Sequence, residues 1–126
     1  MSGARILVVD DNAANVKLAR FVLSKRDFEV RVAVNAEEAM QEIVEHRPQL
    51  VLMDIQMPGT DGLMLTRLLK ADPKTKDLII VAFTAFAMEG DARKSLAAGC
   101  DGYLAKPIDT HTFANQVAAF LEGSHV

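Results

Sequence analysis

The chain has 126 residues, of which 50% are hydrophobic and 25% are charged, and its formal net charge is −3. This composition predicts one globular domain over residues 1–126, with a core from about 4 to 122, and it excludes disordered and fibrous proteins. The absence of a basic stripe argues against direct nucleic-acid binding, and no apolar run approaches the ~20 residues that span a bilayer. We therefore expect a cytoplasmic protein without membrane insertion.

The first half of the chain alternates between strand and helix patterns. The apolar run 5–10 predicts a strand that ends in Asp10 and Asp11, and Asn12 is a plausible N-cap for a helix over 14–25. Residues 28–33 alternate in polarity, as expected for an edge strand, and a helix follows over 36–46. The expected inward residues of the two helices are Val16, Ala19, Val22 and Leu23, then Ala36, Ala39, Met40 and Ile43.

The second half begins with a four-residue apolar run, Leu50 to Met53, that ends on Asp54 and is followed by a Pro-Gly turn signal. A helix is predicted over 61–71, a strand over 78–83 ending at Thr84, and a helix over 88–98 capped by Gly99. The last pair is a short strand over 102–105, ending at Lys106-Pro107, and a helix over 110–121. In the third helix, Leu63, Leu65, Leu68 and Leu69 are expected to face mostly inward.

Five strands that alternate with five helices predict an α/β fold with one parallel sheet and helices on both faces. Strands one, three and four have fully apolar patterns, whereas strands two and five have the patterns of edge strands. This distribution favours the flavodoxin-like (βα)5 order 2-1-3-4-5. The lone Cys100 is expected to be a small buried apolar residue.

The predicted strand order brings carboxylates together. Asp10 and Asp11 end strand one and Asp54 ends its neighbour, and adjacent strands lie ~4.8 Å apart. Such close like charges need a cation or protons to compensate them. Because the strand ends offer oxygen ligands and no Cys or His, the expected metal is Mg²⁺ rather than Zn²⁺.

Two further side chains are expected at the same edge of the sheet. Thr84 ends strand four and offers a hydroxyl, and Lys106 ends strand five and offers a mobile positive charge. A hydroxyl, an ammonium group and a metal beside a carboxylate suit a phosphoryl group attached to that carboxylate. The pattern therefore predicts an aspartyl phosphate on Asp54.

Four motifs follow one another over essentially the whole chain, each at the end of a predicted strand. They are Val9-Asp10-Asp11, Leu52-Met53-Asp54-Ile55-Gln56-Met57-Pro58 with Asp61-Gly62, Phe83-Thr84-Ala85, and Tyr103-Leu104-Ala105-Lys106-Pro107. Together they resemble the CheY-like receiver domain of two-component response regulators. The segment 84–91 resembles receivers of phosphorelays and hybrid kinases, in particular DivK-like stand-alone regulators of the cell cycle. Met1 and the tail after the last helix favour a stand-alone protein.

The resemblance implies a role for each matching position. Asp54 would be the phosphoacceptor. Asp11, Asp54 and the backbone carbonyl of Gln56 would bind Mg²⁺ directly, and Asp10 would act largely through metal-bound water. Lys106 would pair with phosphoryl oxygens and precede a cis Pro107. Thr84 and Tyr103 would form the switch, Ala85 would leave room for the phosphoryl group, and Gln56 and Phe86 would tune the rates.

The resemblance also implies a signalling role. A histidine kinase or histidine phosphotransfer protein would donate the phosphoryl group, and signalling would proceed by phosphorylation-dependent binding to a downstream target protein or kinase. The protein would be a monomer or a weak homodimer. It would not be an enzyme beyond promoting its own phosphoryl transfer and slow dephosphorylation.

Each site residue has a simpler interpretation when it is taken alone. Asp10, Asp11, Asp54 and Thr84 could be turn or cap residues, Lys106 a solvated lysine and Tyr103 an edge-strand aromatic. The main alternative function is a receiver-like adaptor that binds proteins independently of phosphorylation. A haloacid-dehalogenase-like phosphohydrolase would need a second carboxylate two residues after Asp54, where Gln56 stands. Flavin binding would need a hydroxyl- and Gly-rich loop where Asp11-Asn12 stands.

Overall fold

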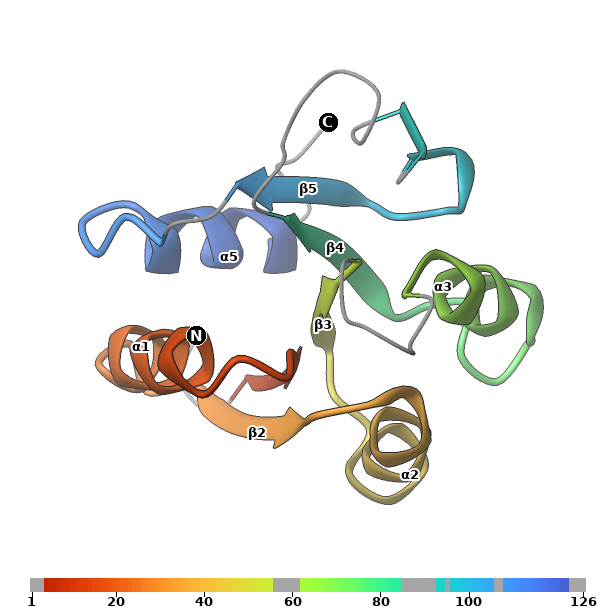
Figure 1. Ribbon diagram of the computed structural model, residues 1–126, viewed down its shortest axis with the longest axis horizontal. Coiled ribbons are helices and arrows are strands. Elements are labelled where there is room, and N and C mark those ends of the chain that lie inside the picture. Colours follow the sequence, from red (N-terminus) through yellow and green to blue (C-terminus); the bar gives the residue numbers. More distant parts are fainter. Residues whose placement is uncertain (1–3, 56–61, 85–92, 95, 106–107, 123–126) are drawn as a thin grey trace.

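Five parallel strands form one sheet in the order β2-β1-β3-β4-β5, as the apolar runs predict (Figure 1). The computed structural model describes residues 4–55, 62–84, 93–94, 96–105 and 108–122. In the described part of the chain, no helix is both long and apolar enough to cross a membrane. The strands are β1 Arg5–Val9, β2 Glu29–Ala33, β3 Leu50–Asp54, β4 Ile79–Thr84 and β5 Gly102–Ala105.

Helices cover both faces of the sheet. On one face lie α1 (Ala13–Ser24) and α5 (Phe113–Leu121), and on the other lie α2 (Ala36–His46) and α3 (Gly62–Ala71) (Figure 1). Of the helix predicted over 88–98, the described residues 93, 94, 96 and 97 are helical, and residues 88–92 and 95 lie outside the described chain. The expected architecture is confirmed.

The central strand β3 joins two apolar clusters, one on each face. Leu52 packs into the cluster beneath α1 and α5, whereas Val51 and Met53 pack into the cluster beneath α2 and α3. Successive side chains of a strand point to opposite faces, so a continuous apolar run is what a doubly covered strand requires. Every residue of β3 is buried, including Asp54 at its carboxyl end.

The connections before the helices follow their sequence signals. Asn12 caps α1, because its side-chain oxygen accepts a hydrogen bond from the Asn15 N–H at 3.0 Å. Asn35 caps α2 in the same way, with a 2.8 Å bond from the Glu38 N–H. These side chains satisfy backbone donors that have no partner within the helix.

Two expected core residues are exposed instead. Met40 of α2 is 38% exposed and Leu68 of α3 is 60% exposed, so their predicted inward orientation is wrong. In α3 the buried stripe runs through Gly62, Leu65, Thr66 and Leu69, which leaves Leu68 on its flank. Thr66 can replace an apolar residue there because its hydroxyl donates a 2.8 Å hydrogen bond to the Gly62 carbonyl.

Cys100 is buried, as predicted, and it lies beside α3. Its thiol lies 4.0 Å from the Thr66 hydroxyl, and burial raises the pKa of the thiol. A raised pKa keeps the group protonated and therefore unreactive near neutral pH. The preceding Gly99 has a φ of 106°, which glycine adopts without strain at the end of a helix.

Candidate functional site

The carboxyl ends of β1 and β3 place two acidic residues side by side. Val9 is paired with Met53 in the parallel register, so Asp10 and Asp54 are the next residues along two adjacent strands. The Asp10 N–H continues the pairing with β2 by donating to the Ala33 carbonyl at 3.0 Å. The position of Asp10 is therefore determined by strand pairing on one side and by its neighbour β3 on the other.

Asp10, Asp11 and Asp54 form an acidic cluster. One carboxylate oxygen from each residue lies within 4.8 Å of those of the other two. Asp10 is fully buried and Asp54 is 4% exposed, whereas Asp11 is exposed to solvent. The Asn12 N–H donates a 2.9 Å hydrogen bond to Asp10 Oδ1, which orients that carboxylate at the start of α1. The cluster is thus buried on the side of Asp10 and Asp54 and open to solvent on the side of Asp11.

The donor set fits a hard divalent cation. Three carboxylates so close together repel one another, and a bound cation offsets that repulsion. All three ligand atoms are oxygens, which Mg²⁺ prefers, and the exposed side leaves room for the water ligands that Mg²⁺ usually retains. These observations support a magnesium site formed by Asp10, Asp11 and Asp54.

The predicted switch residues, Thr84 and Tyr103, lie on β4 and β5. Phe83 is paired with Asp54, so Thr84 lies one residue beyond Asp54 at the carboxyl end of β4. Thr84 is paired in turn with Ala105 of β5. Tyr103, also on β5, is 41% exposed. The backbone therefore brings Thr84 to the edge of the sheet where the acidic cluster lies.

Several predicted positions fall outside the described residues. They are Gln56 in the metal set, Lys106 with the cis bond to Pro107, the access position Ala85, and Phe86. The strand before Lys106 is described, and β5 ends at Ala105 on the same edge of the sheet as β4. The roles assigned to these undescribed residues stay predictions.

Gly62 supports the site by a close backbone contact that its sequence context did not reveal. A Cβ atom at this position would lie 2.9 Å from the Asp54 carbonyl oxygen and 3.1 Å from the Ile55 Cα. Both neighbours are backbone atoms, so the clash could be relieved only by moving α3 away from β3. The sequence motif Asp61-Gly62 indicated a turn, whereas the structure requires a residue without a side chain.

Gly62→Ala should therefore destabilise the protein by about 1–3 kcal/mol, the range for inserting a methyl group into a packed site. Denaturant unfolding monitored by circular dichroism measures this change. In a helix without such a contact, Gly to Ala is usually stabilising, so the sign of the change is informative. A variant more stable than wild type would contradict the close approach of α3 to the Asp54 carbonyl.

The comparisons with known proteins agree with this geometry. The family model of the response regulator receiver domain matches residues 6–118. Among curated proteins, the polar-differentiation response regulator DivK of Brucella anthropi is 38% identical over 116 residues, which cover 92% of this chain and 94% of the relative. DivK of Brucella ovis is 36% identical, with the same coverage.

Solved structures of receivers have the same fold. A CheY-like response regulator receiver domain protein from Methanospirillum hungatei is 29% identical, with a TM-score of 0.85, and the match covers 97% of this chain and 96% of that one. The chemotaxis response regulator CheY4 of Vibrio cholerae has a TM-score of 0.87 at 22% identity, covering 94% and 99%, and supports the fold alone. By sequence and by fold, the chain belongs to the response regulator receiver domain family.

Proposed function

We propose that Asp54 accepts a phosphoryl group from a phosphohistidine donor, and that the phosphorylated protein signals by binding other proteins. The observation that carries this proposal is the acidic cluster at the carboxyl edge of the sheet, in which three carboxylates lie within 4.8 Å of one another. If Asp10, Asp11 and Asp54 were only cap or turn residues, nothing would require their carboxylates to lie so close together. A site for phosphoryl transfer requires such convergence.

In the proposed reaction, a carboxylate oxygen of Asp54 attacks the phosphorus atom of the donor. The P–O bond forms as the P–N bond of phosphohistidine breaks, and the imidazole leaves with the bonding electron pair and takes up a proton. Asp54 remains as an acyl phosphate. Because Asp54 is 4% exposed, its neighbours hold it in one position at the end of β3.

Asp10, Asp11 and Asp54 would hold Mg²⁺, with the backbone carbonyl of Gln56 as a further ligand. When bound, Mg²⁺ would offset the charge of the phosphoryl oxygens beside three carboxylates. Asp11 is exposed and can bind the ion directly, whereas the buried Asp10 is oriented by the Asn12 N–H and would act largely through a metal-bound water. Lys106 would contribute a second positive charge next to the phosphoryl group.

The signal would pass from Asp54 on β3 to β4 and then to β5. The Thr84 hydroxyl would hydrogen-bond the phosphoryl group, and Tyr103 would change its position with it. Tyr103 is 41% exposed on β5, so this change would alter the surface that target proteins contact. The likeness to DivK supports a cell-cycle role in a phosphorelay, with a histidine kinase or phosphotransfer protein as donor.

In this proposal the protein is a cytoplasmic phosphoacceptor and not an enzyme with a separate substrate. It would catalyse only its own phosphorylation and slow dephosphorylation. The alternative is an adaptor that binds partners independently of phosphorylation. That alternative does not account for the acidic cluster, because protein binding that is independent of phosphorylation does not require three adjacent carboxylates.

Incubation with phosphoramidate, with Mg²⁺ or with EDTA, tests the proposal. Intact mass should show one added phosphoryl group only in the presence of Mg²⁺, and hydroxylamine should remove it, because acyl phosphates react with hydroxylamine and phosphoserine does not. The cognate histidine donor serves as a second phosphoryl source. If a folded protein that binds Mg²⁺ gains no phosphoryl group from either source, the adaptor is favoured.

A further inference from the structure

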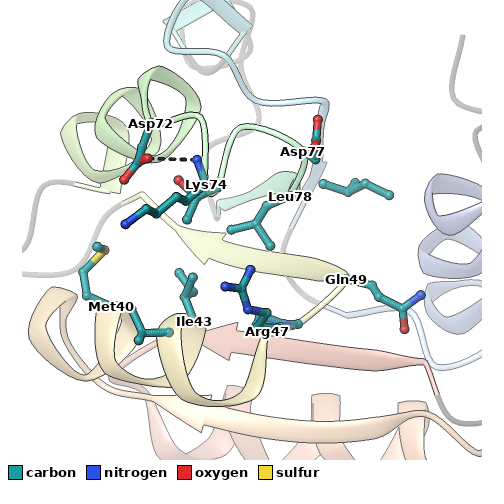
Figure 2. A pocket seen from close by; sticks show the side chains of 12 residues that line it. Met40, Ile43, Arg47, Gln49, Asp72, Lys74, Asp77 and Leu78 are labelled. Atoms are coloured by element: carbon teal, nitrogen blue, oxygen red, sulfur yellow. Dashed lines mark hydrogen bonds between the residues drawn. The ribbon is translucent and has the colours of Figure 1, made fainter.

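A cavity of about 630 Å³ opens at the edge of the sheet opposite the acidic cluster (Figure 2). It lies between the second half of α2 and the segment that leads from α3 into β4, at the amino ends of β3 and β4. Its volume falls within the range of about 300–1,000 Å³ that is usual for ligand sites. Its apolar lining comes from Met40, Ile43, Val44, Pro48, Leu78 and Ile79.

Two cations, Arg47 and Lys74, line this cavity. Within the described part of the chain, neither Arg47 nor Lys74 forms an ion pair. Figure 2 shows the Arg47 guanidinium between Ile43 and Leu78, and the Lys74 side chain extending toward Met40. A ligand in the cavity would therefore meet apolar carbon and two positive charges.

The lining also contains two acidic residues, Asp72 and Asp77, so its formal charges sum to zero. Asp72 Oδ1 accepts a hydrogen bond from the Lys74 backbone N–H at 2.9 Å, which shapes the turn after α3. The Asp77 carboxylate points away from the other labelled side chains in Figure 2. The Arg47 guanidinium is thus the charged group that Figure 2 shows between the apolar side chains of Ile43 and Leu78, where a carboxylate of a ligand would meet it.

Two exposed apolar residues of α2 form one wall of the cavity. Met40 is 38% exposed and Val44 is 67% exposed, and both line the cavity as members of one helix face. The apolar wall formed by α2 is thus open to solvent, which suits a peptide segment better than a small molecule enclosed by a pocket. Regularly spaced apolar anchors of an amphipathic segment commonly bind such grooves.

We propose that this cavity is a docking site for an acidic amphipathic segment of a partner protein. The apolar side chains of that segment would fill the space between Ile43 and Leu78, and a neighbouring carboxylate would pair with Arg47 and Lys74. The site lies at the sheet edge opposite Asp54, so a partner bound there leaves the phosphoacceptor accessible. The proposal is independent of phosphorylation, and it is tested on the unmodified protein.

Two matched peptides test the proposal by NMR titration of the ¹⁵N-labelled protein. Each is about twelve residues long with Leu at every third or fourth position, and the intervening charges are Glu in one peptide and Lys in the other. The Glu peptide should shift the amide signals of Val44, Lys74 and Leu78 in a saturable manner. Long-range attraction to a chain of net charge −3 favours the Lys peptide, so preference for the Glu peptide requires the local cations.

Arg47 permits a variant that removes its charge and preserves the backbone. It is the C-cap of α2 with φ 44° and ψ 68°, a left-handed conformation that asparagine tolerates well. The double variant Arg47→Asn, Lys74→Gln should bind the Glu peptide about tenfold more weakly or worse, the loss expected for charge-assisted hydrogen bonds. The matched control is Lys25→Asn, which removes the C-cap cation of α1 on the other face of the sheet.

Each of the following outcomes would overturn the proposal. The two peptides could bind equally well, the shifts caused by the Glu peptide could map to another face or persist in the double variant, or neither peptide could cause saturable shifts at millimolar concentration. Unchanged amide dispersion of the double variant establishes that it is folded. Weakened binding by Lys25→Asn to the same degree would also contradict the site, because it would assign the effect to net charge.

Discussion

Asp54→Asn should abolish phosphorylation by phosphoramidate in the presence of Mg²⁺, as measured by intact mass. An amide has no anionic oxygen to attack phosphorus, and no other carboxylate of the cluster occupies the end of β3. In the absence of Mg²⁺, the same variant should unfold at higher denaturant concentration than wild type. Removing one of three charges within 4.8 Å relieves repulsion worth about 1–3 kcal/mol.

Mg²⁺ should also stabilise this variant less than it stabilises wild type, because one charged ligand is missing. The control is Glu45→Gln, which removes one negative charge from an exposed side chain of α2. It should be phosphorylated like wild type and should retain the full Mg²⁺ effect. If Asp54→Asn is still phosphorylated to the level of Glu45→Gln, the phosphoacceptor is another residue.

Phe83→Ala should lower the free energy of unfolding by about 3–5 kcal/mol, the usual loss for a buried aromatic side chain. Phe83 is fully buried on β4, and its ring lies 5.8 Å from that of Phe113 on α5, measured between centroids. The substitution removes this contact and leaves a cavity between the sheet and α5. Since small domains are stable by only about 5–15 kcal/mol, the change is a large fraction of the total.

Phe21→Ala is the matched control for the same chemical change at the surface. Phe21 is 60% exposed on α1, and the Lys25 ammonium lies 4.4 Å from its ring centroid. At an exposed site this cation–π contact contributes about 0.5–1 kcal/mol, so the control should lose little stability. Urea unfolding of both variants measures the difference. Equal losses would contradict the assignment of Phe83 to the core.

The sheet could be predicted because its strands carry their own signals. Leu50 to Met53 form an uninterrupted apolar run, which only a strand covered on both faces can bury. The same reasoning placed Asp10 and Asp54 at one edge, since the carboxyl ends of parallel strands converge there. The strand order in turn predicted the acidic cluster that the structure contains.

The rotation of each helix about its own axis, which determines the residues that face the sheet, could not be predicted to the same degree. A leucine on the flank of an apolar stripe has the same sequence pattern as one in its centre, and Leu68 is 60% exposed while Leu69 is 1% exposed. Which of them is buried depends on how α3 packs against the sheet. Similarly, Met40 is 38% exposed because it lines the open cavity beside α2.

The sequence by itself determined the strand order and the edge at which the acidic residues meet, because alternation and apolar runs are local properties of the chain. Only the tertiary structure decided the contact of Gly62 with the Asp54 backbone and the convergence of Arg47 and Lys74 on one cavity. These contacts join different elements of the fold. Their geometry depends on the packing of α2 and α3 against the sheet, which no local pattern specifies.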